Sequence, residues 1–135
     1  MCDPECQTIL PKLKTDLVEI FEACCNKKLA DINIEWTNKK SLCVVLCSKG
    51  YPDTYQKNIL IYNLENFTLD ENNFIFHAGT KEENDKIYAT GGRVLNFISL
   101  SNDFLQAREK AHESIEKLDW NGGFYRKDIG FKVID

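Results

Sequence analysis

The spacing of the apolar residues changes near residue 30, and this change limits the folds available to the chain. Before it, apolar residues recur at intervals of three and four, which indicates one buried face of a helix. These residues are Leu17, Ile20, Phe21, Cys24 and Cys25. Beyond it the interval becomes two, as in a strand, at Ile32, Ile34 and Trp36. We therefore expect a helical segment followed by a β-rich region.

The first helical segment is expected at residues 8–29, as one helix or as two pieces with Pro11 in an early turn. Thr15 is the predicted N-cap, because a hydroxyl there can accept a hydrogen bond from a free amide of the first turn. Asp16 and Glu19 are acidic and suit the positive end of the helix dipole. The segment thus predicts a helix in front of the β-rich region.

Five β segments are expected beyond residue 40. The run SLCVVLCS predicts a strand buried on both faces, and a turn rich in Lys, Glu and Asn is expected at 81–85. Strands flank Gly91-Gly92 on both sides, which predicts a β-hairpin at these glycines. The expected strands are 41–48, 58–64, 73–79, 86–90 and 93–100.

A second helix is predicted after residue 100, capped by Ser101 or Asn102. One of its faces is apolar and the rest of the segment is charged, as in a helix that lies on a sheet. That face comprises Phe104, Ala107, Ala111, Ile115 and Leu118. The tail FYRKDIGFKVID, from residue 124, is expected to form a final strand. The fold class predicted is α+β, β-rich, with one helix in front and one over the sheet.

Composition excludes several classes of protein. A chain of 135 residues can bury one core. It contains neither an apolar run long enough to span a membrane nor a signal-peptide pattern, so a cytoplasmic protein without membrane contact is expected. The net charge is −4 and acidic residues are interleaved with the lysines, which argues against nucleic acid as a partner.

The six cysteines occur as three close pairs: Cys2 with Cys6, Cys24 with Cys25, and Cys43 with Cys47. This is not a usual spacing for zinc ligands, and only His77 and His112 could supplement them. A disulfide framework is not expected without a secretory signal. We expect reduced cysteines that act as small apolar side chains.

Arg93 is the first candidate for a ligand contact, because only three of the 17 basic residues are arginines. Its guanidinium can bind a phosphate or carboxylate at two points, which lysine cannot do. Gly91 and Gly92 would let the backbone approach a ligand closely or adopt positive φ. The alternative, a surface arginine beside a turn, stays open.

The other candidates have simpler interpretations. Arg126 is expected to form a structural ion pair with Asp128 that holds the C-terminal strand, and His77 is expected to be half-buried and hydrogen-bonded. Asp3 and Glu5 are neighbouring carboxylates with little meaning alone. The sequence has no Walker loop, no G-x-S-x-G and no HExxH, so it contains no complete catalytic set.

Several motifs occur together in one order: DPECQTILPKLKTDLVEI, VVLCSKGYP, FHAGT, TGGRVL and YRKDIGFKVI. By these motifs the chain resembles the phosphoribosylamine–glycine ligase (glycinamide ribonucleotide synthetase) family from Asp3 to about Ile134. The resemblance covers only the C-terminal third of such an enzyme. It implies that residues 1–39 are the helical tail end of an ATP-grasp domain, and that 40–135 form a barrel-sandwich hybrid with one covering helix.

The resemblance also implies a reaction. Members use ATP to activate glycine as a glycyl phosphate, which the amine of 5-phosphoribosylamine attacks in de novo purine biosynthesis. Mg²⁺, or Mn²⁺ in its place, bridges the ATP phosphates. The metal ligands and the ATP-binding segments of the family lie upstream of residue 1. This chain alone is therefore expected to bind no cofactor and to be inactive, with the missing N-terminal and ATP-grasp domains as its partners.

The same resemblance implies site residues. Arg93 would reach the 5-phosphate of phosphoribosylamine or the carboxylate of glycine, and Gly91 and Gly92 would allow close backbone approach. Asp3 and Glu5 match the DPE motif near the glycine and metal site. Cys2 departs from the pattern, since the family usually has glycine there.

Two other functions are alternatives to this one. Lipoyl or biotin carrier domains are also barrel-sandwich hybrids, but they present a lysine at a hairpin tip, where this chain has Gly-Gly-Arg. A structural lid or dimerisation module without substrate contact is the second alternative. It predicts that Arg93 can be replaced freely.

Overall fold

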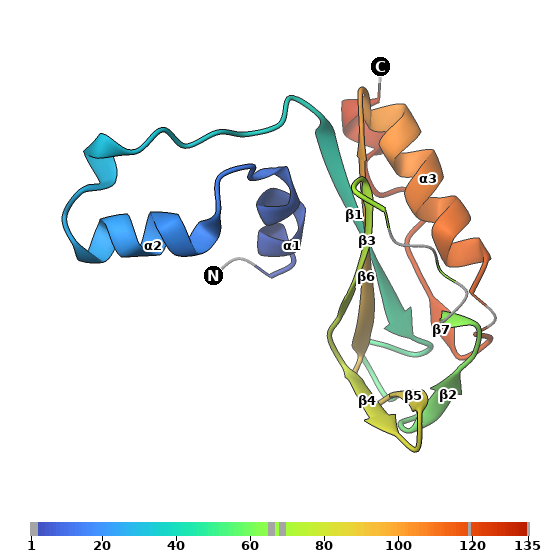
Figure 1. Cartoon of the computed structure of the whole chain (residues 1–135). Coiled ribbons are helices and arrows are strands. Elements are labelled where there is room, and N and C mark those ends of the chain that lie inside the picture. Colours follow the sequence, from blue (N-terminus) through green and yellow to red (C-terminus); the bar gives the residue numbers. More distant parts are fainter. Residues whose placement is uncertain (1–2, 65–66, 68–69, 119, 135) are drawn as a thin grey trace.

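In the computed structural model the chain forms two antiparallel sheets with helices on both sides of the larger one (Figure 1). The structure describes residues 3–64, 67, 70–118 and 120–134. The four-stranded sheet has the order β3 (Asn73–His77), β6 (Arg93–Ser101), β1 (Lys40–Ser48), β7 (Gly123–Phe124). The three-stranded sheet has the order β2 (Ile59–Ile61), β5 (Lys86–Ala89), β4 (Thr80–Glu83). The predicted mixed, β-rich fold class is confirmed.

The core lies between the four-stranded sheet and α3 (Phe104–Glu116). Alternate residues of β1 are buried on this side, and the facing side chains of α3 are mostly alanines, so the helix axis can approach the sheet closely. Burial of each large aliphatic side chain contributes about 1.5–3 kcal/mol. The core between the sheet and α3 includes Leu42, Val44 and Leu46 of β1, Leu95 and Phe97 of β6, and Ala107, Ala111 and Ile115 of α3.

The cap predicted for the second helix is wrong by one residue. Asp103, not Ser101 or Asn102, is the N-cap of α3, and its Oδ1 accepts a hydrogen bond of 2.7 Å from the amide of Gln106. Ser101 is still the last residue of β6 and is buried. The strand therefore continues further than the apolar pattern indicated, and the helix begins after a sharp exit from it.

The N-terminal segment forms separate helical pieces, as the alternative with Pro11 in a turn predicted. They are α1 (Glu5–Ile9), η1 (Leu10–Lys12), α2 (Leu17–Cys25) and η2 (Leu29–Asp31). The predicted N-cap Thr15 is wrong: Oδ1 of Asp16 accepts from the amide of Val18 at 2.7 Å. The hydroxyl of Thr15 instead accepts from the amide of Glu35 at 2.7 Å, so it joins two distant segments.

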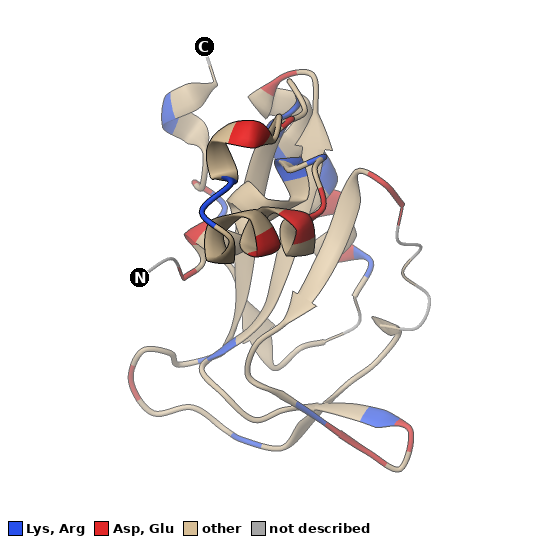
Figure 2. Cartoon of the chain, turned by 60° about the vertical axis from the view of Figure 1, so that its left-hand side comes forward, with Lys and Arg blue, Asp and Glu red and all other residues tan. Residues whose placement is uncertain are grey.

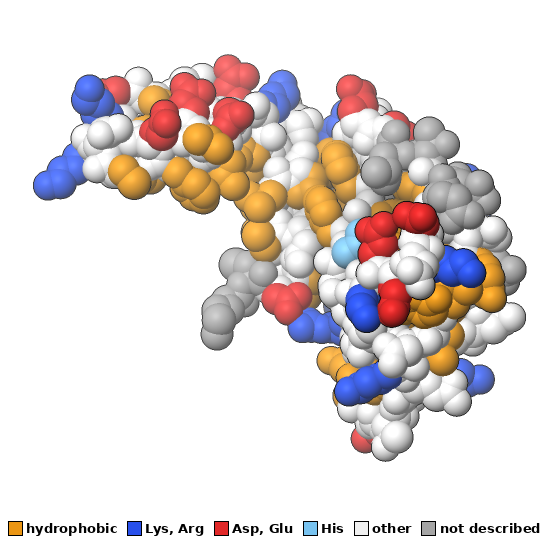
Figure 3. All heavy atoms as spheres, turned by 60° about the horizontal axis from the view of Figure 1, so that its bottom comes forward, with side chains coloured by type: hydrophobic (Ala, Val, Ile, Leu, Met, Phe, Trp, Pro, Cys, Tyr) orange, Lys and Arg blue, Asp and Glu red, His pale blue; other side chains and the backbone are white. Residues whose placement is uncertain are grey.

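The predicted buried stripe of α2 is largely exposed in this chain. Ala23 is the one buried residue of α2, whereas the side chain of Phe21 is 58% exposed and both Cys24 and Cys25 are exposed. The physical reason is its position, since α2 extends away from the sheets (Figure 1). Figure 3 shows the resulting run of hydrophobic side chains along the N-terminal arm, which is the segment formed by α1, α2 and η2.

No strand forms at Ile32, Ile34 and Trp36, which corrects the prediction from their period-two pattern. This stretch is extended but makes one isolated bridge, between Trp36 and Leu13. The segment thus lies against the connection after η1 instead of entering a sheet. The alternation indicated the backbone conformation and could not indicate a strand partner.

The predicted hairpin at Gly91-Gly92 is also wrong. β5 pairs with β2 and β4, whereas β6 pairs with β1 and β3, so the chain passes from one sheet to the other at these glycines. The hairpin in this region joins β4 to β5. Its two turn residues, Asn84 and Asp85, have φ values of 52° and 58°, as tight turns of this kind require.

The tail predicted as a final strand contains only the short β7 and a 3₁₀ turn, η4 (Phe131–Val133). Gly130 interrupts it with a left-handed φ of 81°. Arg108 of α3 holds this tail, because its guanidinium donates to the carbonyl oxygens of Ile129, at 3.0 Å, and of Lys127.

Candidate functional site

Three turns that are far apart in the sequence meet where β6 begins. The amide of Gly79 donates to the carbonyl oxygen of Arg93 at 2.9 Å, and the amide of Gly91 donates to the carbonyl oxygen of Gly79 at 3.0 Å. Ser48, at the end of β1, donates from its amide to Gly92 O at 2.8 Å and from its hydroxyl to Gly91 O at 2.7 Å. The three motifs CSKGYP, HAGT and TGGR thus form one backbone cluster.

The glycines of this cluster are required by close contact. A Cβ on Gly79 would lie 2.6 Å from the Cα of Gly91, and one on Gly92 would lie 2.1 Å from Cδ2 of Tyr51. Both distances are far below van der Waals contact. Positive φ does not explain them, since the glycines with positive φ among the described residues are Gly50 and Gly130. Gly91 and Gly92 therefore have a packing role, and substrate contact through them stays a prediction.

Arg93 forms an ion pair with Asp3, so the start of β6 contacts the segment that precedes α1. Its Nη2 lies 2.6 Å from Oδ2 of Asp3, and the two side chains are 41% and 57% exposed. An ion pair with this exposure contributes about 0–1 kcal/mol to stability. The ion pair therefore contributes little to the stability of the fold, and the guanidinium of Arg93 stays accessible to solvent.

The cysteines of β1 lie on the same sheet face as this ion pair. Cys47 is the strand neighbour of Arg93; burial raises the pKa of its thiol, and the nearby charge of Arg93 opposes that change. Burial raises the pKa of the Cys43 thiol to about 11, although a hydrogen bond with Thr8 opposes it. Both groups are thus protonated thiols at neutral pH, which suits apolar filling better than nucleophilic attack.

Glu5 and His77, the other sequence candidates, do not join the ion pair. Glu5 is the first residue of α1 and is exposed. His77 ends β3, and its Nδ1 lies 2.9 Å from the hydroxyl of Thr80. The predicted hydrogen bond of His77 is confirmed, but its predicted half-burial is wrong because the strand end lies at the surface.

The predicted pair of Arg126 and Asp128 is present, with Nη2–Oδ2 and Nε–Oδ1 distances of 2.6 and 3.0 Å. The hydrogen bonds from Arg126 lower the pKa of the Asp128 carboxyl. Both residues belong to the same exposed turn, so this pair cannot hold the tail against the sheet. Arg108, which no motif of the sequence indicated, performs that task.

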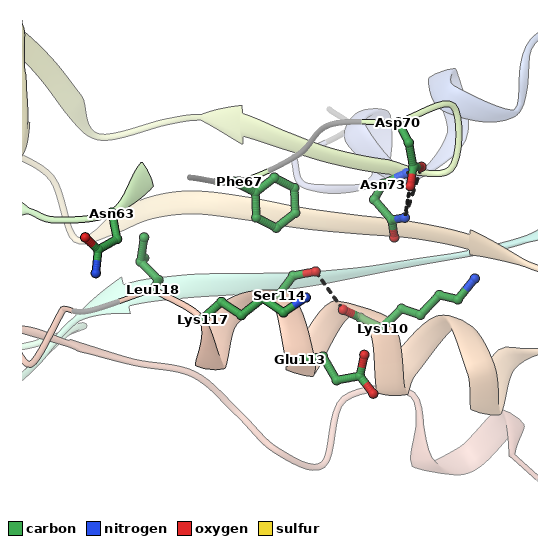
Figure 4. A pocket seen from close by; sticks show the side chains of 9 residues that line it. All are labelled: Asn63, Phe67, Asp70, Asn73, Lys110, Glu113, Ser114, Lys117 and Leu118. Atoms are coloured by element: carbon green, nitrogen blue, oxygen red, sulfur yellow. Dashed lines mark hydrogen bonds between the residues drawn. The ribbon is translucent and has the colours of Figure 1, made fainter. Parts of the chain in front are cut away.

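The largest of the described cavities lies on the face of the four-stranded sheet that α3 covers, opposite to the Arg93–Asp3 ion pair (Figure 4). Its volume is about 420 Å³, and it is lined by side chains of α3 together with Phe67, Asp70 and Asn73. Its charges balance, because Lys110 and Lys117 face the same space as Asp70 and Glu113. The carboxylate of Asp70 already accepts hydrogen bonds from its own turn, which lower its pKa. Local structure therefore accounts for much of this lining.

The described residues contain no helix that is long and apolar enough to cross a membrane. No three His, Cys, Asp or Glu side chains of that part lie close enough together to hold a metal ion. Figure 2 shows acidic and basic residues interleaved along the chain.

Comparison with known proteins gives a consistent result. Residues 41–132 match the family model described as "Phosphoribosylglycinamide synthetase, C domain". The chain is 43% identical to the phosphoribosylamine–glycine ligase of Fusobacterium nucleatum, over 96% of this chain and 31% of that protein. It is 39% identical to the trifunctional purine biosynthetic protein adenosine-3 of Gallus gallus, over 98% of this chain and 13% of that protein.

A solved structure matches as well. The crystal structure of phosphoribosylamine–glycine ligase from Thermotoga maritima superposes with a TM-score of 0.68 at 32% sequence identity. The match covers 96% of this chain and 31% of that one. The chain therefore spans less than a third of the length of these relatives.

Proposed function

The chain belongs to the phosphoribosylglycinamide synthetase C-domain family, and on this premise we propose that it is the C-terminal portion of a phosphoribosylamine–glycine ligase. The complete ligase joins 5-phosphoribosylamine and glycine and converts ATP to ADP and phosphate through a glycyl phosphate. We assign ATP and Mg²⁺ to polypeptide outside these residues, because the resemblance places the metal ligands and the ATP-binding segments of the family upstream of the DPE motif that contains Asp3. The barrel-sandwich description stays a prediction.

The observation that supports a substrate role is the accessible guanidinium of Arg93 on a fixed backbone. The hydrogen bond from the amide of Gly79 to the carbonyl oxygen of Arg93, and the pairing of Arg93 with Cys47, hold the start of β6, while the Arg93 side chain is 41% exposed. A charged fork on a rigid base suits recognition of a substrate anion. We propose that this residue contacts substrate, with Gly91 and Gly92 as its supporting backbone and Asp3 paired with it. Glu5, two residues after Asp3 in the DPE motif, is proposed as a further substrate contact.

The first test compares this chain with the complete ligase that contains it. The complete protein should form glycinamide ribonucleotide and release phosphate when given ATP, Mg²⁺, glycine and phosphoribosylamine. The 135 residues alone should release no phosphate under the same conditions. Phosphate release by the chain alone would contradict the assignment of nucleotide and metal to other segments, and an inactive complete protein would contradict the proposed function.

We also propose that residues 1–39 complete an ATP-grasp domain, with 40–135 as the substrate-closing domain. The arm formed by α1, α2 and η2 carries an apolar surface that the described residues leave uncovered (Figure 3). Upstream polypeptide of the ligase would cover this surface. The exposed apolar residues of the arm and the following segment are Ile9, Leu10, Val18, Phe21, Leu29 and Trp36.

Val18→Ala tests this division. The side chain of Val18 is 63% exposed here, so in the isolated chain the free energy of unfolding should change by less than about 0.5 kcal/mol. In the complete ligase the same change should cost about 1–2 kcal/mol, because two buried methyl groups are lost. Thermal unfolding of both proteins measures the difference. Glu22→Ala, on the same helix, is the control, and equal effects of Val18→Ala in both proteins would contradict the proposal.

A further inference from the structure

The C-terminal tail, which comprises residues 123–134, lies along α3 (Figure 1), where Arg108 and His112 contact it. Nε of Arg108 donates to the carbonyl oxygen of Ile129 at 3.0 Å. One helical turn further on, the ring of His112 lies against the ring of Tyr125, with 5.3 Å between their centroids. Beyond β7 the described part of the tail forms no strand. Side-chain contacts, rather than strand pairing, therefore hold this part of the tail.

Nε2 of His112 is buried and has no hydrogen-bond partner among the described residues. A neutral imidazole tolerates this position, because one of its two ring nitrogens carries no proton. The imidazolium carries an N–H at both nitrogens, so protonation would bury a charged donor without an acceptor. Burial of such a group costs more free energy than burial of a neutral one. The packed position of this ring thus favours its neutral form.

The charges around His112 act in both directions. Arg108 on α3 and Lys127 on the tail disfavour a proton on this ring, whereas Glu116 on α3 favours one. Glu116 is exposed, and its Oε1 lies 3.4 Å from the hydroxyl of Tyr125, so solvent screens much of its effect on the ring. Burial, followed by the charge of Arg108, lowers the pKa of His112 below the usual value of about 6.5.

We propose that His112 acts as a pH-sensitive latch, and that protonation of its ring releases the tail from α3. A charged ring gains free energy by turning out to water, and Tyr125 then loses its contact with α3. Because the attached tail favours the neutral ring, the latch is closed above about pH 6.5 and opens as the pH falls below that value. The latch acts within this chain and does not rest on the proposed function.

The other end of the tail is attached by its backbone beside the turn cluster. β7 pairs with the end of β1 at Cys47 and Ser48, and the amide of Ser48 donates to the carbonyl oxygen of Gly92 at 2.8 Å. Release is expected to stop at this pairing, because the backbone hydrogen bonds of β7 do not depend on the charge of His112. The released part should therefore be residues 125–134, and β1 should keep its order.

An NMR titration of the 135-residue chain from about pH 7.5 to about pH 5 tests the latch. The chain has two histidines, His77 and His112, so each ring can be followed separately. The His112 ring should titrate at a lower pH than histidine in an unstructured peptide, and its NOE to the Tyr125 ring should disappear as it does so. The order parameters of the amides of residues 125–130 should fall from about 0.85 to below about 0.6, while those of β1 stay high.

His112→Phe keeps a ring against Tyr125 but cannot be protonated, so its tail should stay ordered over the whole pH range. His112→Gln should behave in the same way, and it replaces the phenylalanine variant if that one does not fold. His77→Gln is the matched control, because His77 is exposed and contacts Thr80 away from the tail, and it should leave the release intact. A tail that stays ordered when His112 is protonated, or that becomes equally mobile in His112→Phe, would overturn the proposal. So would loss of order in β1 at the same pH, since that indicates unfolding of the whole chain.

Discussion

Arg93→Lys in the complete ligase is expected to lower kcat/KM for one of the two substrates joined, with the KM for ATP unchanged. Lysine retains the positive charge and can still pair with Asp3, but it cannot make a planar two-point contact. Loss of such a charged contact costs about 1.5–3 kcal/mol, or about 10- to 150-fold in kcat/KM. Steady-state kinetics with each substrate varied in turn measure the effect.

The substrate affected decides between the alternatives for this residue. A loss confined to glycine indicates that Arg93 contacts the glycine carboxylate, and a loss confined to phosphoribosylamine indicates that it contacts the 5-phosphate. Arg126→Lys is the control, because Arg126 forms an ion pair of the same length away from the turns. Wild-type kinetics for every substrate would favour the structural lid, in which Arg93 is a surface residue.

Gly79→Ala is expected to destabilise the chain by about 2–3 kcal/mol through overpacking. The added Cβ would lie 2.6 Å from the carbonyl oxygen of Arg93 and 2.6 Å from the Cα of Gly91. Both atoms belong to backbone that is held by hydrogen bonds, so neither can move without loss of the cluster. Chemical denaturation of the isolated chain measures the free energy of unfolding directly.

Ala78→Ser is the control for this substitution. It also adds one heavy atom, but at an exposed neighbouring position, and should change stability by less than about 0.5 kcal/mol. In the complete ligase, Gly79→Ala should also impair the substrate that Arg93 contacts, since the shifted carbonyl belongs to Arg93 itself. Unchanged stability of Gly79→Ala would show that the three turns do not meet as closely as described.

The sequence predicted those elements whose signal is local. The run around Val44 is a strand because a continuous apolar segment that includes two valines can be buried on a sheet. The helix with Ala107 and Ala111 follows from the three-and-four spacing of its apolar face. The family was recognisable for the same reason, since its motifs are continuous stretches of sequence.

Predictions that depended on a distant partner were less successful. Gly91-Gly92 is flanked by two strands, as in a hairpin, yet those strands pair with different sheets. The apolar residues up to Trp36 alternate as in a strand, yet the segment forms a single isolated bridge, with Leu13. Period and turn residues describe the local backbone, whereas strand pairing is decided by segments far away in the chain.

The candidate site shows the same division. The sequence alone determined that Arg93 is an unusual arginine beside glycines and that Asp3 lies in a motif, because residue type and spacing can be read directly. Only the tertiary structure decided that these two residues pair across 90 positions, and that Gly79 and Tyr51 make the glycines necessary. The reason is that a glycine becomes necessary only where a remote segment lies too close for a Cβ atom. One sequence does not indicate which remote segments will meet.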